Sequence, residues 1–426
     1  MGSRLRGNDD SRRGRFRGSD ERDWLHYPGA GARSMKVAIV ADDLTGALDA
    51  AAPFAKRGLD TRVVCLPDGI AAAARTPCDV LAVTTASRHL PAERAETAVA
   101  EACRVLVAAA PEVLFKKIDS TLRGNPVAES LAAARITRRR RVVFCPAAPS
   151  QGRTVRNGAV HVEGVPLSET AYARDALSPP SPDPLDVQVK RLAAGMAYRQ
   201  VAVEEVWDDE GFLVADCATD LDLAAVAEQA TADPAGTLLV GAGGLADAVA
   251  GSLYGSPVAP AEPILPDGTT LLFLVGSRAE KSRKQAAMLA SRDGTLIHLA
   301  ADAEIDAESI GDSLNGDVEA LLVQPVARGG VSLEAELVAA RLGAGAAALI
   351  ANGHIGGMLV TGGDTLAAVL RALNAPTLTV VSELYPGIPL TRIDVGGLPL
   401  WVVSKAGGFG HDSLFTDLVT LFGRKR

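Results

Sequence analysis

The chain has 426 residues, of which 48% are hydrophobic and 22% charged, so it can bury the cores of two or three domains and cannot be disordered throughout. Aromatic residues make up only 4% and the net charge is -8, which disfavours a base-stacking or polyanion-binding surface, so we expect no nucleic-acid partner. The 5 cysteines show no C-x-x-C spacing, which argues against a zinc site or a disulfide framework and favours a reducing, cytoplasmic location. No run of roughly 18 apolar residues is present, and we expect no membrane partner.

Residues 1–34 differ in composition from everything that follows. They are rich in Arg, Gly and Ser and contain almost no aliphatic side chains. Because such a segment cannot bury a core, we predict that it is a disordered tail. Met35 then opens an apolar run, so we expect the first domain, and with it the natural translation start, at Met35.

From residue 36, short β-branched runs alternate with amphipathic stretches rich in Ala, Leu, Arg and Glu. This spacing predicts strands at 36–40, 61–65, 80–84, 113–118, 142–145, 212–215 and 237–240, and helices at 44–57, 92–109, 126–135 and 220–230. Alternation of this kind is typical of βαβ units in a mainly parallel sheet. Residues 150–185 break the pattern, which predicts a long irregular loop with a functional role. We place the first domain at 35–254.

Residues 255–268 contain four prolines and are predicted to form a linker. A second α/β domain is expected at 269–426. Its first strand begins at Thr270, and further strands are predicted at 295–299, 320–323, 357–360, 378–381 and 400–403, with helices at 333–350, 365–373 and 413–422. The fold class that follows is α/β, with two three-layer domains and mainly parallel sheets.

Polar side chains follow several predicted strands of the first domain, where ligands bind in open parallel sheets. Asp42 and Asp43 come directly after the first strand. One of them is expected to cap the next helix, which leaves the other for a hydroxyl group or for proton transfer. The other candidates are Arg88, Lys116, Lys117, Asp119, Ser120, Arg123 and Arg153. A site for a polar ligand that carries a carboxylate is the functional interpretation of this grouping, and a solvated charged turn is the alternative.

Three glycine-rich corners follow strands of the second domain. They are VGSR at 275–278, TGGDT at 361–365 and SKAGGFG at 404–410. Adjacent glycines before a helix let backbone N–H groups approach phosphate oxygens, although each corner alone is also typical of a tight turn. Together they predict a nucleotide-phosphate site. Its candidate residues are Ser277, Gly362, Gly363, Asp364, Thr365, Lys405, Gly407 and Gly408.

Several familiar motifs are absent or incomplete. A P-loop is absent, and the histidines show no H-x-x-H or H-E-x-x-H spacing, so we expect no metal site made by the protein alone. GAGGLA at 241–246 matches a dinucleotide-binding fingerprint, but no acidic residue follows at the end of a second strand to hold a ribose. An NAD(P)-dependent dehydrogenase of a small hydroxy acid is therefore kept as an alternative.

Seven motifs, in order along the chain, resemble those of the four-carbon acid sugar kinases, a family once known only as a domain of unknown function. They are ADDLTGALD at 41–49, KKIDSTLRGN at 116–125, PAAPSQGRT at 146–154, VGSR at 275–278, TGGDT at 361–365, ELYPGIP at 383–389 and SKAGGFG at 404–410. The resemblance covers the chain from residue 35 to about residue 422. The Arg-rich tail has no counterpart in the family pattern.

This resemblance implies an enzyme that uses ATP to phosphorylate a terminal hydroxyl of erythronate, threonate or 3-oxo-tetronate. It implies that the first domain holds the sugar acid through Asp43, Arg88, Lys116, Lys117, Ile118 and Asp119. It also implies that the second holds ATP through Ser277, Gly362 to Thr365 and Gly407. Mg²⁺ is expected to arrive with the ATP, near Asp364. A non-catalytic sugar-acid sensor is a further alternative, but it has no use for three glycine corners.

Our hypothesis for the mechanism assigns roles within this set. Arg88 and either Lys116 or Lys117 hold the substrate carboxylate, while Asp43 or Asp119 orients and deprotonates the attacking hydroxyl. Closure of the two domains excludes water. The sequence does not specify the stereochemistry of the acid, and a homodimer is expected only from the general frequency of twofold assemblies.

Overall fold

The computed structural model describes residues 35–259, 263–266, 268–291, 296–300, 305–314, 318–324 and 334–423. The predicted tail at 1–34 and part of the predicted linker at 255–268 lie outside these residues. The described residues all belong to one compact unit of the chain.

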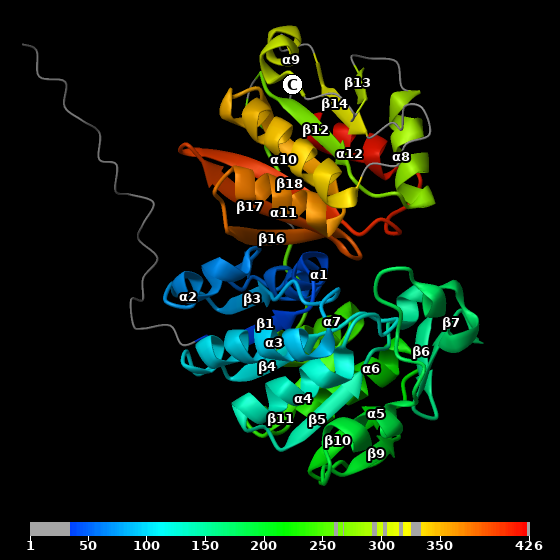
Figure 1. Cartoon of the computed structure of the whole chain (residues 1–426). Helices are drawn as coiled ribbons and strands as arrows, with labels where there is room; N and C mark the ends of the chain where they lie inside the picture. Colours follow the sequence, from blue (N-terminus) through cyan, green and yellow to red (C-terminus); the bar gives the residue numbers. More distant parts are fainter. Residues whose placement is uncertain are drawn as a thin grey trace, which may run out of the picture. The chain divides into compact units, whose positions relative to one another are not determined.

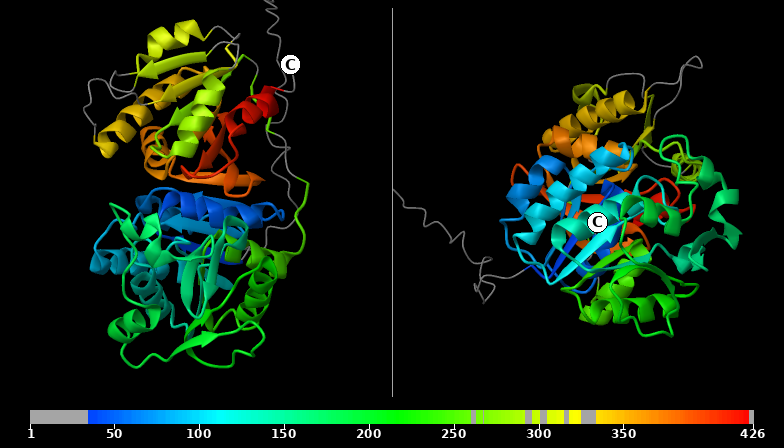
Figure 2. Two further views of the ribbon diagram at one scale, coloured as in Figure 1. Left: turned by 90° about the vertical axis from the view of Figure 1, so that its right-hand side faces the viewer. Right: turned by 60° about the horizontal axis from the view of Figure 1, so that its bottom comes forward.

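The first half of the chain is built around parallel strands (Figure 1). These strands are β1 (Val37–Ala41), β2 (Thr61–Val64), β3 (Val80–Thr84), β4 (Val113–Lys117), β5 (Arg141–Cys145), β9 (Tyr198–Val201), β10 (Gly211–Ala215) and β11 (Thr237–Gly241). Their order in the sheet is β2-β3-β1-β4-β11-β5-β10-β9. The helices are α1 (Leu44–Ala55), α2 (Ile70–Ala73), α3 (Ala92–Val107), α4 (Pro126–Thr137), α5 (Leu185–Leu192), α6 (Asp220–Thr231) and α7 (Gly243–Tyr254). Helices α3 and α4 pack together, as do α1, α6 and α7, so each group covers one face of the sheet (Figures 1 and 2).

The second half repeats this architecture. Its strands are β12 (Thr270–Val275), β13 (Leu296–Ala300), β14 (Ala320–Gln324), β15 (Ile355–Thr361), β16 (Thr377–Tyr385), β17 (Ile388–Val395) and β18 (Leu398–Lys405). Its helices are α8 (Glu280–Ala290), α9 (Ala307–Ser313), α10 (Ala335–Ala351), α11 (Gly363–Ala372) and α12 (Leu414–Gly423). Strands β13-β14-β12-β15-β18 are parallel, and β17 and β16 follow β18 in antiparallel order.

The two parallel sheets are continuous with each other. Strand β16 pairs antiparallel with β2, with Thr377 opposite Val64 and Val380 opposite Thr61, and a 15-stranded sheet results. The predicted α/β class with mainly parallel pairing is confirmed. The sequence analysis predicted neither β17 nor the joining of the sheets. The joining was missed because pairing between distant edge strands leaves no local signal.

The predicted irregular loop contains some regular structure of its own. Strands β6 (Arg153–Arg156), β7 (Ala159–Val162) and β8 (Val165–Pro166) form a separate antiparallel sheet of 3 strands. Two short 3₁₀ helices follow, at Leu167–Glu169 and Ala171–Arg174; others lie at Pro67–Gly69 and Pro149–Gln151.

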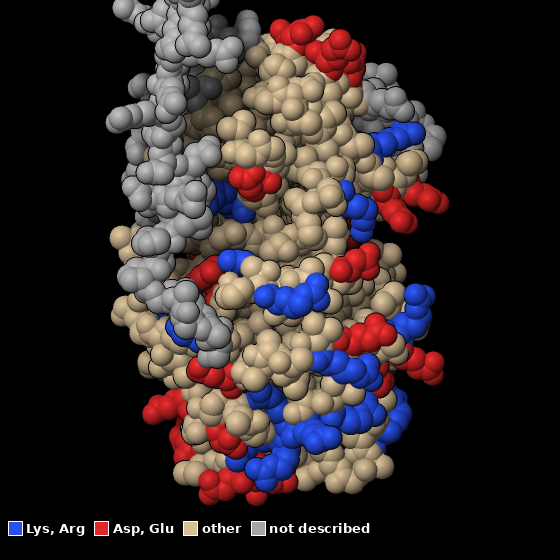
Figure 3. Space-filling model, turned by 90° about the vertical axis from the view of Figure 1, so that its left-hand side faces the viewer, with Lys and Arg blue, Asp and Glu red and all other residues tan. Residues whose placement is uncertain are grey.

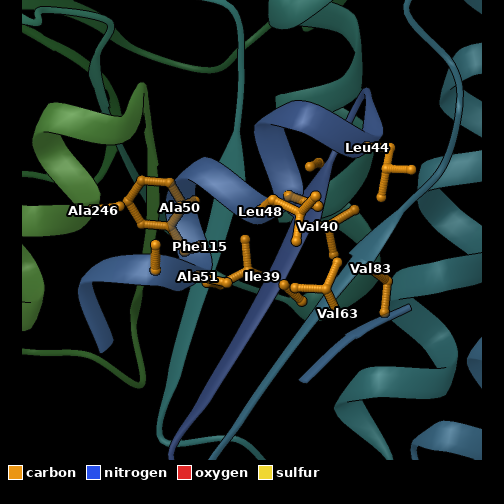
Figure 4. Close-up of a cluster of buried hydrophobic side chains, with 14 of the residues drawn as sticks. Ile39, Val40, Leu44, Leu48, Ala50, Ala51, Val63, Val83, Phe115 and Ala246 are labelled. Atoms are coloured by element: carbon orange, nitrogen blue, oxygen red, sulfur yellow. The ribbon is translucent and has the colours of Figure 1, made fainter. Parts of the chain in front are cut away.

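The core of the first half lies between the sheet and its helices. Strands β1, β3 and β11 are buried over their whole length, as expected for parallel strands covered on both faces. Figure 4 shows Ile39 of β1 and Phe115 of β4 close to Leu48 of α1 and Ala246 of α7. Each large buried side chain of this kind contributes roughly 1.5–3 kcal/mol. This packing fixes the ends of the central strands, where the polar candidates lie.

The surface carries both signs of charge on the face drawn in Figure 3. Exposed pairs such as Arg135 with Glu96, at 3.2 Å, add little to stability because water screens them. None of the described helices is long and apolar enough to cross a lipid bilayer.

Candidate active site

The strand order brings the polar segments of the first half to one edge of the sheet. Strands β3, β1, β4 and β11 are neighbours, and their register aligns Ala41 with Thr84 and Lys117, and Lys117 with Gly241. Since parallel strands end at the same edge, the residues that follow them lie together. The candidates that the sequence analysis placed after separate strands therefore form one cluster.

Arg88 organises two of the carboxylates in this cluster. Its Nε donates to Asp42 Oδ2 at 2.7 Å and its Nη2 to Asp42 Oδ1 at 2.9 Å, which is the bidentate geometry of a strong pair. Its Nη1 donates to Asp43 Oδ2 at 2.7 Å. Burial acts to raise the pKa of Asp43, but the charges of Arg88 and Lys117 outweigh it and leave that pKa below its ordinary value.

Asp43 is also the N-cap of α1. Its Oδ1 accepts from the backbone N–H of Gly46 at 2.8 Å, and its Oδ2 accepts from Thr45 Oγ1 at 2.7 Å. The capping interpretation thus applies to Asp43, and the same carboxylate is held at the edge of the sheet beside Arg88. A group that is both cap and cation partner is rigidly positioned, which suits it to orient a ligand hydroxyl.

Asp119 is held just as firmly. Its Oδ2 accepts from Arg123 Nε at 3.0 Å and its Oδ1 from Arg123 Nη2 at 2.8 Å, and Thr121 donates to it from both its backbone N–H and its hydroxyl. Burial acts to raise the pKa of Asp119, but Arg123 and Arg88 together hold it far below its ordinary value. Asp119 is therefore ionised at every ordinary pH.

The two adjacent lysines of β4 point to opposite faces of the sheet, because side chains alternate along a strand. Lys116 is fully buried and its Nζ lies 2.7 Å from Glu129 Oε2, while Ser87 Oγ donates to Glu129 Oε1 at 2.7 Å. Lys117 lies on the side of α1, with its Nζ 3.4 Å from Asp49 Oδ2. The structure thus separates the two candidates: Lys117 belongs to the cluster, whereas the charge of Lys116 is satisfied inside the protein.

The remaining first-half candidates are Ile118, Ser120 and Arg153. Ile118 is buried, and its backbone N–H donates to the carbonyl of Gly241 at 3.0 Å. Ser120 is half-buried in the turn that follows. Arg153, on β6, donates from Nη2 to the hydroxyl of Tyr172 at 3.1 Å.

Sequence reasoning missed two residues of the long loop that return to the cluster. Asp175 lies 3.6 Å from Arg123, and Ser178 Oγ donates to the carbonyl of Arg88 at 3.0 Å. Both residues come from the stretch that was predicted only as an irregular functional loop. A loop without periodicity gives no signal for which of its residues returns to the site.

The three glycine corners of the second half meet at one edge, because β12, β15 and β18 are neighbours in the sheet. The backbone N–H of Ser277 donates to Thr361 Oγ1 at 3.2 Å, and that of Gly362 to the carbonyl of Lys405 at 3.2 Å. A Cβ at Gly407 would overlap the side chain of Ser277, so this close approach requires glycine. Thr365 is buried beside Gly276, whereas Asp364 and Gly408 are exposed.

Lys405 lies beneath these corners as a buried cation. Its Nζ donates to the carbonyl of Gly407 at 3.2 Å, and among the described residues no carboxylate forms an ion pair with it. Burial, aided by the charge of Lys281, lowers the pKa of Lys405 to about 7. A cation without an anionic partner beside a glycine corner fits a phosphate group, and so do the surrounding hydroxyl and N–H donors.

The two halves of the chain meet at these edges. The first residue of α11, Gly363, lies against the first turn of α1: a Cβ at Gly363 would be 3.5 Å from Thr45 Cγ2 and 4.0 Å from Leu44 Cβ. The first turn of α1, which Asp43 caps, is thus close to the glycine corner that opens α11. Two helices begin at the same place, and both direct their positive ends there.

Comparison with known proteins divides the chain into the same two halves as the fold. A family model described as a sugar-binding N-terminal domain matches residues 37–249, and one described as a nucleotide-binding C-terminal domain matches residues 272–415. A D-threonate kinase of Bordetella bronchiseptica is 35% identical over 89% of this chain and 95% of its own length. A D-threonate kinase of Salmonella typhimurium is 32% identical over 90% of this chain and 97% of its own.

A solved Haemophilus influenzae protein, from a family called domain of unknown function 1537, shares the fold. The TM-score is 0.71 at 21% identity, over 90% of this chain and 100% of the other. The chain belongs to the four-carbon acid sugar kinase family, as its seven motifs indicated. It is therefore an enzyme of the carbohydrate-acid kinase class.

Family membership removes the dehydrogenase and sensor alternatives. The structure also explains why the GAGGLA match is misleading. A Cβ at Gly243 would overlap the carboxylate of Asp49, so the start of α7 faces an acidic side chain of the protein. A pyrophosphate at that position would be repelled.

Proposed function

We propose that this chain transfers the terminal phosphoryl group of ATP to a terminal hydroxyl of a four-carbon sugar acid. The observation that carries the proposal is the contact between the start of α11 and the start of α1 at Gly363 and Thr45. This contact places the capped carboxylate of Asp43 beside the glycine corner. Phosphoryl transfer needs the acceptor and the donor phosphate side by side, and catalysis consists largely of this positioning and of charge neutralisation.

The sugar acid would lie at the first-half cluster. Arg88, Arg123 and Lys117 supply cations for its carboxylate, and Asp43 and Asp119 supply acceptors for its hydroxyls. Lys116 would affect the sugar-acid site only through Glu129, because its ammonium is buried against that carboxylate. Ile118 and Ser120 would line the site through the turn after β4, and Arg153 would close it from β6.

ATP would lie at the second-half corners. Its phosphates would be held by Ser277, Gly362, Gly363, Thr365, Lys405, Gly407 and Gly408. ATP would supply the phosphoryl group, and Mg²⁺ bound with it would neutralise phosphate charge, with Asp364 as the residue that could contact the ion. The chain's own contribution is to bind these groups, to align the hydroxyl and to exclude water.

Asp43 or Asp119 is our sequence-based choice for the base. Either group would first have to release the guanidinium that now holds it, because Arg88 donates to Asp43 and Arg123 donates twice to Asp119. Both carboxylates also have lowered pKa values, which weakens them as proton acceptors. They suit hydroxyl binding better than deprotonation.

D-threonate is the first substrate to test, because two relatives that cover most of the chain carry that name. The experiment measures ADP formation by the full-length chain with Mg-ATP and a panel of D- and L-threonate, D- and L-erythronate and 3-oxo-tetronates. Turnover with one acid at least about 10-fold above the rest supports the proposal and names the substrate; a tenfold preference corresponds to roughly 1.4 kcal/mol of discrimination. ATP binding without turnover on any of them contradicts it.

A further inference from the structure

Asp49 lies on α1, six residues after Asp43, and the proposed function gives it no role. Its Oδ2 is 3.4 Å from Lys117 Nζ, and the start of α7 at Gly243 lies against the same carboxylate. The side chain is 21% exposed, so it is not fully enclosed by the protein.

Asp49 differs from its neighbouring carboxylates in how much of its acceptor capacity is used. Both oxygens of Asp42 accept from Arg88, and both oxygens of Asp119 accept from Arg123. Both oxygens of Asp43 are used as well, by its helix cap and by Arg88. Within the described part of the chain, the one ion pair of Asp49 is the long contact to Lys117. Asp49 therefore has more acceptor capacity left for a substrate than these three carboxylates.

Asp49 also lies where the sugar-acid half meets the nucleotide half. A Cβ at Gly387, in the turn between β16 and β17, would be 3.7 Å from Asp49 Oδ1. The same Cβ would overlap the ring of Phe409, which belongs to the glycine corner after β18. The turn is tied to α1 a second time, because Glu383 accepts from the backbone N–H of Gly387 at 2.8 Å and pairs with Lys56 at 3.0 Å.

We propose that Asp49 is the proton acceptor of the phosphoryl transfer, an assignment that rests on the proposed function. The substrate hydroxyl oxygen forms a bond to the terminal phosphorus of ATP, the bond from that phosphorus to the ADP oxygen breaks, and ADP leaves with the bonding pair. The hydroxyl proton passes to the Asp49 carboxylate and then to water. Lys117 lies beside Asp49, where its positive charge would offset the negative charge of the phosphoryl group that is transferred.

The charges around Asp49 agree with this role. Burial raises the pKa of Asp49, and Lys117 offsets only part of that effect, while the negative charges of Asp43 and Asp119 add to it. A carboxylate with a raised pKa accepts a proton more readily than the strongly paired Asp43 and Asp119. The start of α7 and the ammonium of Lys117 are the groups that favour its ionised form.

The test compares Asp49→Asn and Asp49→Glu with a matched control, Asp247→Asn. Asp247 is also an aspartate whose partner, Arg57, lies two residues after the end of α1, but it lies outside the cluster. We expect Asp49→Asn to lower kcat at least about 100-fold while the ATP Kd and the substrate KM change less than about 3-fold. Asp247→Asn should keep wild-type kcat.

The pH profile separates a base from a group that only positions Lys117. In the wild type, kcat should fall at acidic pH as Asp49 becomes protonated, which gives the pH profile an acidic limb. Asp49→Glu should show the same acidic limb with a lower kcat. Asp49→Asn should show no acidic limb. An Asp49→Asn kcat within about 3-fold of wild type, or a loss confined to KM, overturns the assignment.

If Asp49→Asn does not fold, the pH profile of Asp49→Glu decides, and the absence of an acidic limb in that profile overturns the assignment too. A wild type that turns over none of the acids contradicts the proposed function, and this assignment with it. A working wild type with an unimpaired Asp49→Asn contradicts the assignment alone.

Discussion

The ammonium of Lys405 donates to Ser282 Oγ at 2.9 Å, and that hydroxyl donates in turn to the carbonyl of Gly407 at 2.9 Å. This short chain links α8, the end of β18 and a glycine corner. Together with the direct bond from Lys405 to the Gly407 carbonyl, it gives the ammonium two acceptors but does not neutralise its charge. The pKa of about 7 follows from burial without a counterion.

ATP binding should therefore be accompanied by proton uptake. Phosphate charge beside Lys405 favours the ammonium form, so the pKa of Lys405 rises on binding, and a site that is partly deprotonated at pH values above about 7 becomes fully protonated. Calorimetric titration with Mg-ATP at about pH 8, in two buffers of different ionisation enthalpy, measures this uptake. Lys405→Met should abolish the difference between buffers and weaken binding. Equal enthalpies in both buffers for the wild type would contradict the prediction.

Lys116 and Glu129 should behave as a buried pair. Lys116→Met leaves the carboxylate of Glu129 buried without its cation, and we expect a loss of about 3–5 kcal/mol in the free energy of unfolding. The double variant Lys116→Met/Glu129→Gln removes both charges and should recover most of this loss. Urea unfolding measures the stability and steady-state kinetics the activity. A double variant that is stable but inactive would show that the charged pair is needed for activity and not only for stability.

Asp119 should contribute to stability in a way that depends on pH. Its pKa is held below the ordinary value, so the contribution is complete above the pKa of the unfolded chain, which is about 4 for an aspartate, and is lost as the pH falls toward the lower folded value. The stability difference between the wild type and Asp119→Asn should shrink as the pH drops from about 5 to about 3. Urea unfolding across that range tests the sign. A gap that stays constant would show that the effect of Asp119 is not one of charge.

Arg88→Lys should raise the KM for the sugar acid. A lysine cannot reproduce the bidentate contact with Asp42 together with the contact to Asp43, so both carboxylates lose their fixed geometry. We expect at least about a 10-fold higher KM, since one charge-assisted hydrogen bond is worth roughly 1.5–3 kcal/mol. Arg135→Lys, on the surface, is the control. An unchanged KM for Arg88→Lys would remove Arg88 from the substrate site.

The sequence predicted the parts of the site that lie at strand ends. The clustering of Asp43, Arg88 and Asp119 follows from parallel pairing, which periodicity reveals. The opposite directions of Lys116 and Lys117 also follow from strand alternation, once β4 is known to end at Lys117.

Other features depend on contacts between distant segments. Asp49 became a candidate only from the structure, because α1, the start of α7 and the β16–β17 turn meet around its side chain. Asp175 and Ser178 come from a loop whose path no repeating pattern encodes. These contacts are tertiary, and a single sequence contains no local signal for them.

The pairing of β2 with β16 has a consequence for any attempt to separate the halves. Cutting the chain at the proline-rich segment would leave each fragment with a bare edge strand, β2 on one and β16 on the other. Exposed edges of this kind template association with other chains. Expressed separately, the fragments should aggregate or pair with copies of themselves, and expressed together they should reassemble through this edge into one functional sheet.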